Sequence, residues 1–450
     1  QRAVDNIQSR LQDGLAFRGL TAERLRIPFI QVAGTNGKGS VSSMIAAGLR
    51  AAGYRTGLYT SPHLHRYTER VRIDGEPLGA REAARRIAEL LAWAEQKEAP
   101  ELSFFELGTL LAVEVFMAHR CDVAVMEVGL GGRLDATTAL PASLSVITRI
   151  ARDHEALLGD SLPKIAAEKA GIIRHGVPVI VGSPGAAVQR VILAQARRLR
   201  APVRLVGRDF RALPGRGGRV AFEVGGTRIA GVELGLAGEY QRDNAAIAVA
   251  ALCALSARGL RVPVAAVRDG LTQVRWPARL EHHAATSSMP ALLFDAAHNP
   301  DGCAALARHL QSEQARPRVL VFGAMADKDY PQMLALLAPK SVRARSPSRT
   351  MRAIPTTRTS SVALSPTTRT RLSTRTTSTA VTWKMMTRWP TAQKKARTQT
   401  ASERRRNDRN QPRVAVVRIS AGRSSCMPLG FTAALGWPSG NGSPVTRSWP

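Results

Sequence analysis

One stretch of the sequence combines glycines, a lysine and hydroxyl groups: Gly34-Thr35-Asn36-Gly37-Lys38-Gly39-Ser40. An apolar strand candidate precedes it, and a helix-patterned run, Ser40–Ala52, follows it. At such a junction, backbone N–H groups and the helix dipole favour a phosphate, and a lysine adds a point charge. The strict phosphate-loop pattern is broken twice, because Val32 replaces the first glycine and Gly39 separates Lys38 from Ser40. The flanking strand and helix still predict a nucleotide-phosphate site, with ATP as the expected ligand.

Two further side chains follow apolar strand candidates and are candidate metal ligands. Glu127 ends the run Val123–Glu127, and His154 follows Leu144–Ile150 beside Asp153. Parallel α/β sheets bind ligands at the carboxyl ends of their strands, and Mg²⁺ prefers hard oxygen ligands. Asp153 is placed to orient the imidazole. The alternative interpretation of Glu127 is a helix-capping or ion-paired carboxylate. The alternative interpretation of Asp153-His154 is an ordinary surface pair.

Strand and helix candidates alternate with short turns up to Ala338, which predicts a doubly wound α/β fold. The strand candidates are mostly short apolar runs, as in parallel strands covered on both faces. They are Phe29–Ala33, Thr56–Tyr59, Asp122–Val128, Leu144–Ile150, Val177–Val181, Leu292–Asp295 and Val319–Phe322. The helix candidates are Ser40–Ala52, Ala80–Gln96, Leu107–His119, Ala186–Leu199, Arg242–Ala257 and Gly302–Glu313.

The same pattern divides the chain into parts. Residues 219–234 predict a β-hairpin around Gly225-Gly226, and residues 281–290 are polar, small and unpatterned. We therefore expect an ATP-binding domain at 1–281, a linker at 282–290, and the start of a smaller Rossmann-like domain at 291–340.

The composition limits the class of protein. A chain of 450 residues is long enough for two domains with sizeable cores. Its four cysteines lack the spacing of a disulfide framework or a zinc site. The longest apolar run, Ala245–Leu255, is too short to cross a bilayer, and no signal segment follows Gln1. We expect reduced thiols and a cytoplasmic protein.

The net charge of +30 is concentrated in a C-terminal tail. Residues 341–450 contain 21 Lys and Arg against Glu403 and Asp408, which leaves +11 for the first 340 residues. Thr, Arg and Ser dominate this tail without an amphipathic period, a composition unsuited to a core. The tail is predicted to come from a shifted reading frame or mistaken gene model beginning near Lys340. A natural disordered tail and an RNA-binding extension are the alternatives.

The motif GTNGKGS resembles the folylpolyglutamate synthase/dihydrofolate synthase family, relatives of the Mur peptide ligases. Further segments follow in the family's order over residues 28–340: Ser61-Pro-His-Leu64, Glu69-Arg-Val-Arg72, Phe105-Glu-Leu-Gly-Thr109, Glu127–Thr137, Asp153-His154, Glu168-Lys-Ala-Gly-Ile172, Arg279-Leu-Glu281 and Phe294–Pro300. The resemblance implies a phosphate-loop nucleotide-binding domain followed by a truncated or frameshifted glutamate-binding domain. The implied enzyme is an ATP-dependent ligase that adds L-glutamate to dihydropteroate or (tetrahydro)folate polyglutamate through an acyl phosphate.

The resemblance also implies roles for individual residues. ATP contacts are implied for Gly34, Thr35, Asn36, Gly37, Lys38, Gly39, Ser40, Asn244, Arg279 and Asp295. Mg²⁺ ligation is implied for Ser61, Glu127 and His154, and catalytic roles for Lys38, Lys169 and His154, with Lys169 carbamylated. The pterin or folate is expected at Ser103, Phe104, Phe105, Glu106, Leu134, Asp135 and Ala136, and the glutamate side at His298 and Asn299. Without the resemblance, the phenylalanines are equally suited to packing in a core, and Lys169 is suited to a salt bridge.

Several departures from the family pattern and several other hypotheses remain. Tyr240-Gln241 replaces a common His-Gln, and Ala151-Arg152 replaces Gly-Leu before Asp153. One alternative is a Mur-type muropeptide ligase, which Gly39 and the Ser61-Pro-His-Leu64 segment disfavour. Another is a basic nucleic-acid-binding protein, which is disfavoured because most of the positive charge lies in the tail. An inactive product of a damaged gene is a further alternative. The ligase hypothesis predicts a monomer with small-molecule substrates and no membrane or specific nucleic-acid partner.

Overall fold

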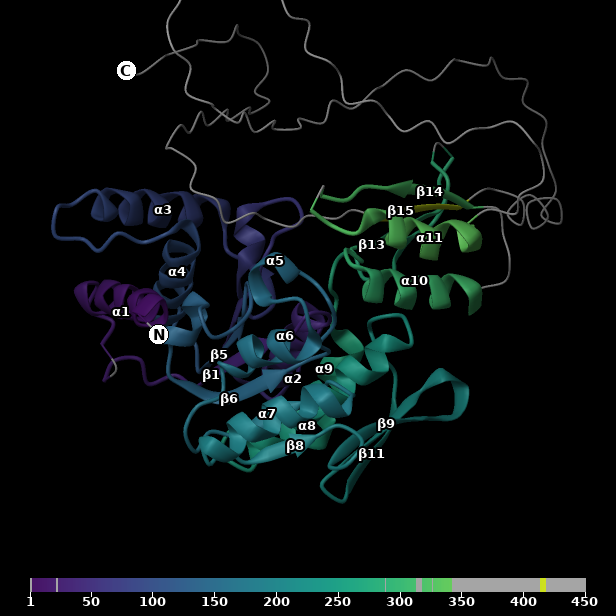
Figure 1. The fold of residues 1–450 in the computed structure, drawn as a ribbon, viewed down its shortest axis with the longest axis horizontal. Helices are drawn as coiled ribbons and strands as arrows, with labels where there is room; N and C mark the ends of the chain where they lie inside the picture. The colour runs from purple at the N-terminus through teal and green to yellow at the C-terminus, as the bar shows by residue number, and fades with distance from the viewer. Residues whose placement is uncertain are drawn as a thin grey trace, which may run out of the picture.

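The computed structural model describes residues 2–21, 23–287, 289–312, 318–325, 327–341 and 413–417 (Figure 1). Among these residues the largest sheet has eight strands in the order β4-β3-β2-β5-β1-β6-β7-β8. They are β1 (Phe29–Ala33), β2 (Thr56–Tyr59), β3 (Val71–Ile73), β4 (Glu76–Pro77), β5 (Val123–Glu127), β6 (Ala142–Ile147), β7 (Val179–Val181) and β8 (Val203–Leu205). The strands from β2 to β8 in this order are parallel, whereas β3 and β4 add an antiparallel edge. The predicted α/β fold is confirmed.

Helices cover both faces of this sheet, which is why its central strands are apolar throughout. In β5, Val123 and Val125 belong to one core, and Ala124 and Met126 belong to another, because successive side chains of a strand point to opposite faces. The first core includes α2 (Lys38–Ala51), α8 (Tyr240–Ser256) and α9 (Val264–Gln273). The second includes α1 (Arg2–Phe17), α3 (Ala80–Ala94) and α4 (Phe104–Ala118). A third core packs α6 (Leu162–Ala170) and α7 (Ala186–Arg198) beside β6, β7 and β8.

A small antiparallel sheet follows α7 in the chain. It consists of β9 (Phe210–Pro214), β10 (Val220–Val224) and β11 (Thr227–Val232) in the order β11-β10-β9. The turn between β10 and β11 is Gly225-Gly226, with φ values of 55° and 83°. Two-residue hairpin turns of this kind need positive φ at both positions, which glycine adopts without a steric penalty. The predicted hairpin is confirmed.

A second parallel-dominated sheet is built from the later part of the chain (Figure 1). Its order is β12-β13-β15-β14, where β12 is Glu281–His283, β13 is Leu292–Asp295, β14 is Arg318–Phe322 and β15 is Arg413–Val417. Helices α10 (Pro300–Ser312) and α11 (Tyr330–Ser341) pack together beside it around Cys303, Leu306 and Met333. This sheet carries the loop Ala296–Pro300 toward the first sheet.

Two parts of this sheet differ from the sequence predictions. Glu281–His283 were expected at the end of the first domain and in a linker, but they pair with β13 as β12. Arg413–Val417 belong to the tail whose composition was considered unsuited to a core, but they pair in parallel with both β13 and β14. The run Val414-Ala-Val-Val417 is rich in β-branched residues, which favour strands, despite its basic surroundings. The remainder of the predicted tail lies outside the described residues.

In the part of the chain that the structure describes, no helix is both long and apolar enough to cross a membrane. The described cysteines, Cys121, Cys253 and Cys303, are free thiols.

Candidate active site

The phosphate loop joins β1 to α2, and two of its glycines occupy conformations that favour glycine. Gly37 precedes α2 with φ 89°, and Gly34 has φ 151°. A Cβ added at Gly34 would lie 1.8 Å from the hydroxyl oxygen of Thr148. Lys38 is the first residue of α2, and its Nζ donates to the carbonyl oxygen of Thr35 at 3.3 Å. This turn therefore combines a helix N-terminus with a positive side chain, a pairing that suits an anionic ligand.

A second lysine reaches the same loop from α6. Lys169 is buried, and its Nζ donates to the carbonyl oxygen of Gly34 at 2.8 Å. Burial, reinforced by the charge of Lys38, lowers the pKa of Lys169 to about 7. A large share of this amine is therefore neutral near neutral pH, and a neutral amine is nucleophilic.

Glu127 ends β5 at the carboxyl edge of the large sheet and is buried. Burial raises the pKa of Glu127, although the charge of Lys38 and a hydrogen bond from Ser61 act in the opposite direction. That hydrogen bond runs from the backbone N–H of Ser61 to Oε2 of Glu127 at 3.2 Å. The structure therefore brings these two predicted metal ligands together.

Asp153 is the centre of a buried polar cluster between the two sheets. Its Oδ1 accepts a hydrogen bond from Nζ of Lys328 at 2.6 Å, and its Oδ2 accepts one from Nδ2 of Asn299 at 3.1 Å. Nε2 of His298 lies 3.4 Å from Oδ2. Burial alone would raise the pKa of Asp153, but His298, Lys328 and His154 hold it well below its usual range. Asp153 is therefore ionised and attracts polar side chains from the second sheet.

His154 lies next to this cluster, at the start of the short helix α5 (Glu155–Leu158), with φ 52°. Its Nε2 is 3.3 Å from Nζ of Lys328. Burial lowers the pKa of His154; the charge of Asp153 opposes this effect, and the charges of Lys328 and Lys38 add to it. The imidazole is therefore neutral near neutral pH, the form that ligates metals.

The donors available for Mg²⁺ are few but chemically suitable. Among the described residues, no three Asp, Glu, His or Cys side chains form a metal-binding group. A cation held by Ser61, Glu127 and His154 would have one carboxylate, one hydroxyl and one imidazole. Mg²⁺ keeps several waters and needs only one or two protein carboxylates, so this donor set fits it.

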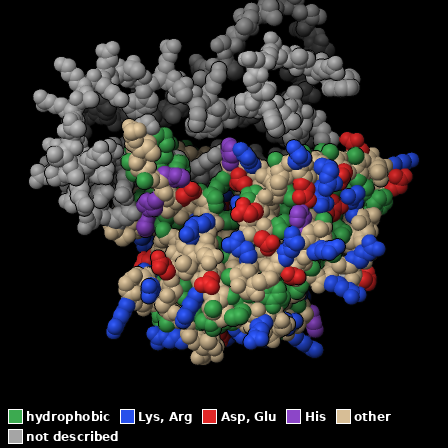
Figure 2. All heavy atoms as spheres, turned by 180° about the vertical axis from the view of Figure 1, so that it is seen from behind, with side chains coloured by type: hydrophobic (Ala, Val, Ile, Leu, Met, Phe, Trp, Pro, Cys, Tyr) green, Lys and Arg blue, Asp and Glu red, His purple; other side chains and the backbone are tan. Residues whose placement is uncertain are grey.

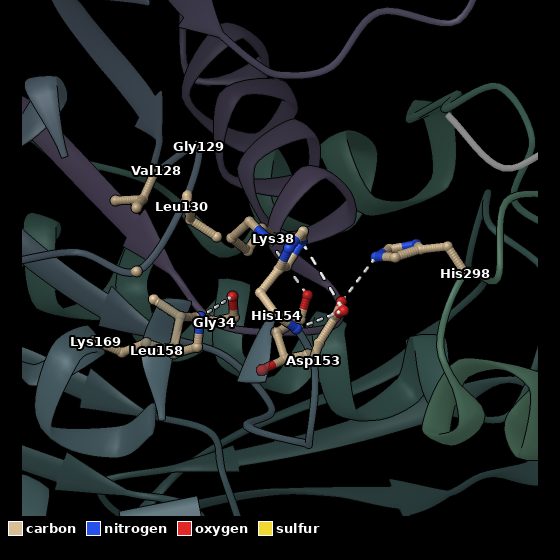
Figure 3. A pocket seen from close by; sticks show the side chains of 12 residues that line it. Gly34, Lys38, Val128, Gly129, Leu130, Asp153, His154, Leu158, Lys169 and His298 are labelled. Carbon is tan, nitrogen blue, oxygen red and sulfur yellow. Dashed lines mark hydrogen bonds and ion pairs between the residues drawn. The ribbon is translucent and has the colours of Figure 1, made fainter. Parts of the chain in front are cut away.

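Figure 3 shows a cleft that Lys38, Asp153, His154, Lys169 and His298 line together, whereas Ser61 and Glu127 are not part of its lining. Its lining comes from the phosphate loop, the segments after β5 and β6, α5, α6 and the loop after β13. The lining residues are Gly34, Thr35, Lys38, Val128, Gly129, Leu130, Gly131, Asp153, His154, Leu158, Lys169 and His298. Lys38 brings a positive charge beside the N-terminus of α2, and the one carboxylate of the lining, Asp153, is already ion-paired. The cleft therefore favours anionic groups such as phosphates and carboxylates.

Of the ten predicted ATP contacts, Gly34, Thr35 and Lys38 line the cleft, whereas the other seven lie outside this lining: Asn36, Gly37, Gly39, Ser40, Asn244, Arg279 and Asp295. Nδ2 of Asn244 donates to Oε1 of Gln241 at 2.8 Å. Asp295 ends β13 and accepts from the hydroxyl of Tyr240 at 3.2 Å and from two backbone N–H groups. Burial raises the pKa of Asp295, and the nearby charge of Arg279 opposes it. The loops around β13 thus meet the start of α8 at the junction of the two sheets.

The candidate pterin residues at the start of α4 have different surroundings. Ser103 caps α4 in a capping box with Glu106, and Glu106 also accepts from Nη2 of Arg10 in α1 at 3.1 and 3.2 Å. Phe105 packs against the ring of Tyr59 at 6.0 Å, whereas Phe104 is 63% exposed. Glu106 therefore caps α4 and binds α1. Phe104 presents the more exposed ring, which also contacts Tyr67 and Arg70.

Asp135 is likewise engaged within the chain. It caps the 3-10 turn η2 (Ala136–Ala139) and accepts from the backbone N–H groups of Gly129, Leu130 and Thr137. Burial raises the pKa of Asp135, against these hydrogen bonds. Asp135 therefore shapes the segment Gly129–Leu130, which lines the cleft.

Sequence reasoning missed several residues of this region. Lys328 is buried against Asp153, and Asp301 binds both Asn36 and Arg149. Lys328 follows the predicted strand Val319–Phe322, so its position after a strand end was the available signal. The partners are more than 140 residues apart in the sequence, and no local pattern connects them.

Comparison with known proteins first defines the class. The Mur ligase middle domain matches residues 32–252, and the Mur ligase glutamate ligase domain matches residues 278–357, past the expected end of resemblance at Lys340. The two α/β sheets therefore correspond to the middle and glutamate ligase domains of Mur ligases, a class of ATP-dependent ligases.

More specific similarities define the family. The chain is 38% identical over 315 residues to folylpolyglutamate synthase of Lacticaseibacillus casei, covering 68% of this chain and 73% of that protein. It is 37% identical to dihydrofolate synthase/folylpolyglutamate synthase of Escherichia coli K12, covering 74% and 77%. A solved FPGS–AMPPCP–folate complex matches with a TM-score of 0.68 and 35% identity over 74% of this chain and 82% of that one. E. coli FolC in complex with DHPP and ADP matches with a TM-score of 0.64 and 36% identity, covering 76% of each chain. The chain belongs to the folylpolyglutamate synthase/dihydrofolate synthase family of ATP-dependent ligases.

Proposed function

We propose that this protein adds L-glutamate to dihydropteroate, to (tetrahydro)folate polyglutamate, or to both, using ATP and Mg²⁺. The observation that carries the proposal is the meeting of Lys38, Lys169 and His298 in one cleft. The two lysines come from the phosphate-loop side, and His298 comes from the loop after β13. A nucleotide bound on one side and an amino acid on the other would therefore react at a shared position.

The proposed reaction has two steps. A carboxylate oxygen of the pteroate or folate attacks the γ-phosphorus of ATP, and the bond to the bridging oxygen of ADP breaks. The glutamate nitrogen then attacks the acyl carbon, inorganic phosphate leaves, and the nitrogen loses a proton. Lys38 would neutralise charge on the transferred phosphoryl group, which stabilises a transition state that spreads negative charge. Bound Mg²⁺, held by Ser61, Glu127 and His154, would supply further charge neutralisation.

Lys169 is proposed to be carbamylated, as the resemblance implied. Its neutral fraction and its burial beside Gly34 support a reaction with carbon dioxide, because carbamylation requires an uncharged amine. The product would be a carboxylate in the cleft that Lys38 and His154 also line. Lys38, Lys169 and His154 are the proposed catalytic residues.

The pterin side of the substrate is proposed to lie near α4 and the segment after β5. Phe104 offers an exposed ring, and Asp135, in the proposed pterin segment Leu134–Ala136, accepts from the backbone of Gly129 and Leu130, which line the cleft. Glutamate is assigned to His298 and Asn299. Asn244, Arg279 and Asp295 are assigned to ATP at the junction of the two sheets.

The proposal also covers domain organisation and partners. Residues 1–281 would bind ATP, and residues from about 291 to 340 would begin the glutamate-binding domain. A monomer is expected, and a nucleic-acid partner is not. On the face shown in Figure 2, Lys and Arg side chains are interspersed with Asp and Glu, whereas polynucleotide binding usually depends on a continuous basic surface.

A glutamate-dependent ADP-release assay on the full chain tests the proposal. We expect ADP release only when ATP, glutamate and either dihydropteroate or tetrahydrofolate are all present. The same assay on Lys164→Ala controls for loss of a surface lysine, because Lys164 is exposed and pairs with Asp160. ADP release at the same rate without glutamate, or with no pterin acceptor, would contradict the proposal.

A further inference from the structure

The phosphate loop is held from the side of the second sheet through the amide of Asn36. Nδ2 of Asn36 donates to Oδ1 of Asn299 at 3.1 Å and to Oδ2 of Asp301 at 2.8 Å. In return, Nδ2 of Asn299 donates to Oδ1 of Asn36 at 2.9 Å. Both ends of the Asn36 amide are therefore bonded to residues at the start of α10, more than 260 positions away in the sequence.

Asp301 also forms a bidentate ion pair with Arg149, which follows β6. Nε and Nη2 of Arg149 approach Oδ1 of Asp301 at 3.0 and 2.7 Å, and Nε approaches Oδ2 at 2.8 Å. The guanidinium thus binds the carboxylate in the two-pronged geometry that fixes the orientation of both groups. Oδ2 of Asp301 therefore accepts hydrogen bonds from both Asn36 and Arg149.

The backbone of Arg149 also contacts the phosphate loop. Its carbonyl oxygen accepts from the N–H of Thr35 at 2.8 Å and from the N–H of Asn36 at 3.2 Å. The side chain of Arg149 therefore contacts α10 while its main chain contacts the phosphate loop. Asn36, Asp301 and Arg149 form a ring of hydrogen bonds that joins the two sheets, and we call these three residues the clasp.

The clasp is suited to positioning rather than to global stability. The side chains of Arg149 and Asp301 are 49% and 26% exposed, and exposed ion pairs contribute little to stability. Their geometric effect is larger, because Asn36 sits between the glycines that shape the phosphate loop. Other nearby charges are Asp243, which faces Arg149, and Arg308, which faces Asp301.

We propose that Arg149 and Asp301 are positioning residues for the nucleotide: they orient Asn36 and so make the phosphate-binding shape of the loop depend on the docking of α10. This inference rests on the proposed function in that the loop takes a nucleotide. The residues themselves act through Asn36 and need no contact with the nucleotide.

A double-mutant cycle on the full chain tests the clasp, using Arg149→Ala, Asp301→Ala and the double variant. The first readout is hydrogen–deuterium exchange of the phosphate-loop amides without nucleotide. The second is the Kd of the non-hydrolysable analogue AMPPCP, measured by calorimetry. We expect faster loop exchange and a Kd raised about fivefold in each single variant, the effect of an ion pair at the upper end for exposed sites. The double variant should be no weaker than either single one, because both changes break the same ring.

Arg211 and Glu223 supply a matched control. They form an exposed pair of similar geometry between β9 and β10, at 2.6 Å, with 58% and 31% of their side chains exposed. The Arg211→Ala/Glu223→Ala cycle should change neither readout. Asp301→Asn, which keeps an oxygen for Asn36 but loses the charge, should fall between the wild type and Asp301→Ala.

The outcomes separate this inference from the proposed function. Unchanged loop exchange in a folded Asp301→Ala variant overturns the clasp, and so does an effect that adds across the cycle. Faster exchange with an unchanged AMPPCP affinity overturns its role in nucleotide positioning. A wild-type chain that binds no AMPPCP contradicts the proposed function and the nucleotide role together, and loop exchange still decides whether the clasp exists.

Discussion

The ion pair of Lys328 with Asp153 gives the sharpest stability prediction. The perturbation is Lys328→Met, which removes the ammonium but keeps an unbranched side chain of similar length. The Lys328 and Asp153 side chains are 4% and 6% exposed, and Nζ lies 2.6 Å from Oδ1. Removing one partner of a buried pair typically costs about 3–5 kcal/mol, because the other charge stays buried without compensation. Asn299 and His298 still contact Asp153 in the variant, so we expect about 3 kcal/mol, the lower end of that range.

Urea unfolding at neutral pH measures this loss of free energy of unfolding. Adding Asp153→Asn to Lys328→Met should recover most of the loss, because it removes the uncompensated charge. Lys164→Met is the control, since Lys164 is 63% exposed and should change stability by less than about 0.5 kcal/mol. The pKa of Asp153 is lower in the folded chain than its ordinary value of 3.8. The pair's contribution should therefore be complete above pH 3.8 and decline as the pH falls further. A Lys328→Met variant as stable as Lys164→Met, or a double variant that loses the sum of both single losses, would refute this reasoning.

Three further predictions concern the loop and its lysines. Lys38→Ala should abolish ATP-dependent ligation while Lys164→Ala retains it, as measured by ADP release; near-parental activity of Lys38→Ala would remove the phosphate-loop argument. Gly34→Ala should be destabilised by more than about 2 kcal/mol in urea, because its Cβ meets a hydroxyl at 1.8 Å, whereas Gly53→Ala meets nothing within 4 Å and should lose only about 1 kcal/mol. Equal losses would contradict the steric reasoning. The pKa of Lys169 is about 7 in the folded chain and 10.5 ordinarily, so the unfolded chain binds more protons between these values. Wild-type stability should therefore rise with pH across that window relative to Lys169→Met, and parallel pH profiles would refute it.

The local part of the site was predictable from sequence because strand, glycine turn and helix are adjacent in the chain. β1 and β2 have the predicted bounds, and α2 begins two residues earlier than predicted, at Lys38. The placement of Glu127 at a strand end also followed from a short apolar run. These features depend on neighbours within a few residues, which a single sequence displays.

The remaining features depend on distant partners. Glu106 suited pterin binding by its chemistry, but Arg10 of α1 and the cap of α4 already use its oxygens. The strand Arg413–Val417 was not predicted because the residues around it are basic and polar. Its place between β13 and β14 depends on strands about 100 residues earlier in the chain. Asn36 looked like a nucleotide ligand, yet its amide is bonded to Asn299 and Asp301. In each case the competing partner is brought in by tertiary structure alone.

The central claim is that the cleft makes an acyl phosphate and then an amide. The most direct measurement uses dihydropteroate with a heavy-oxygen-labelled carboxylate, together with ATP and glutamate, followed by mass spectrometry of the products. One labelled oxygen per turnover should appear in inorganic phosphate, and the pterin product should carry a new glutamyl amide. Phosphate released without label, while the amide forms, would contradict the central claim.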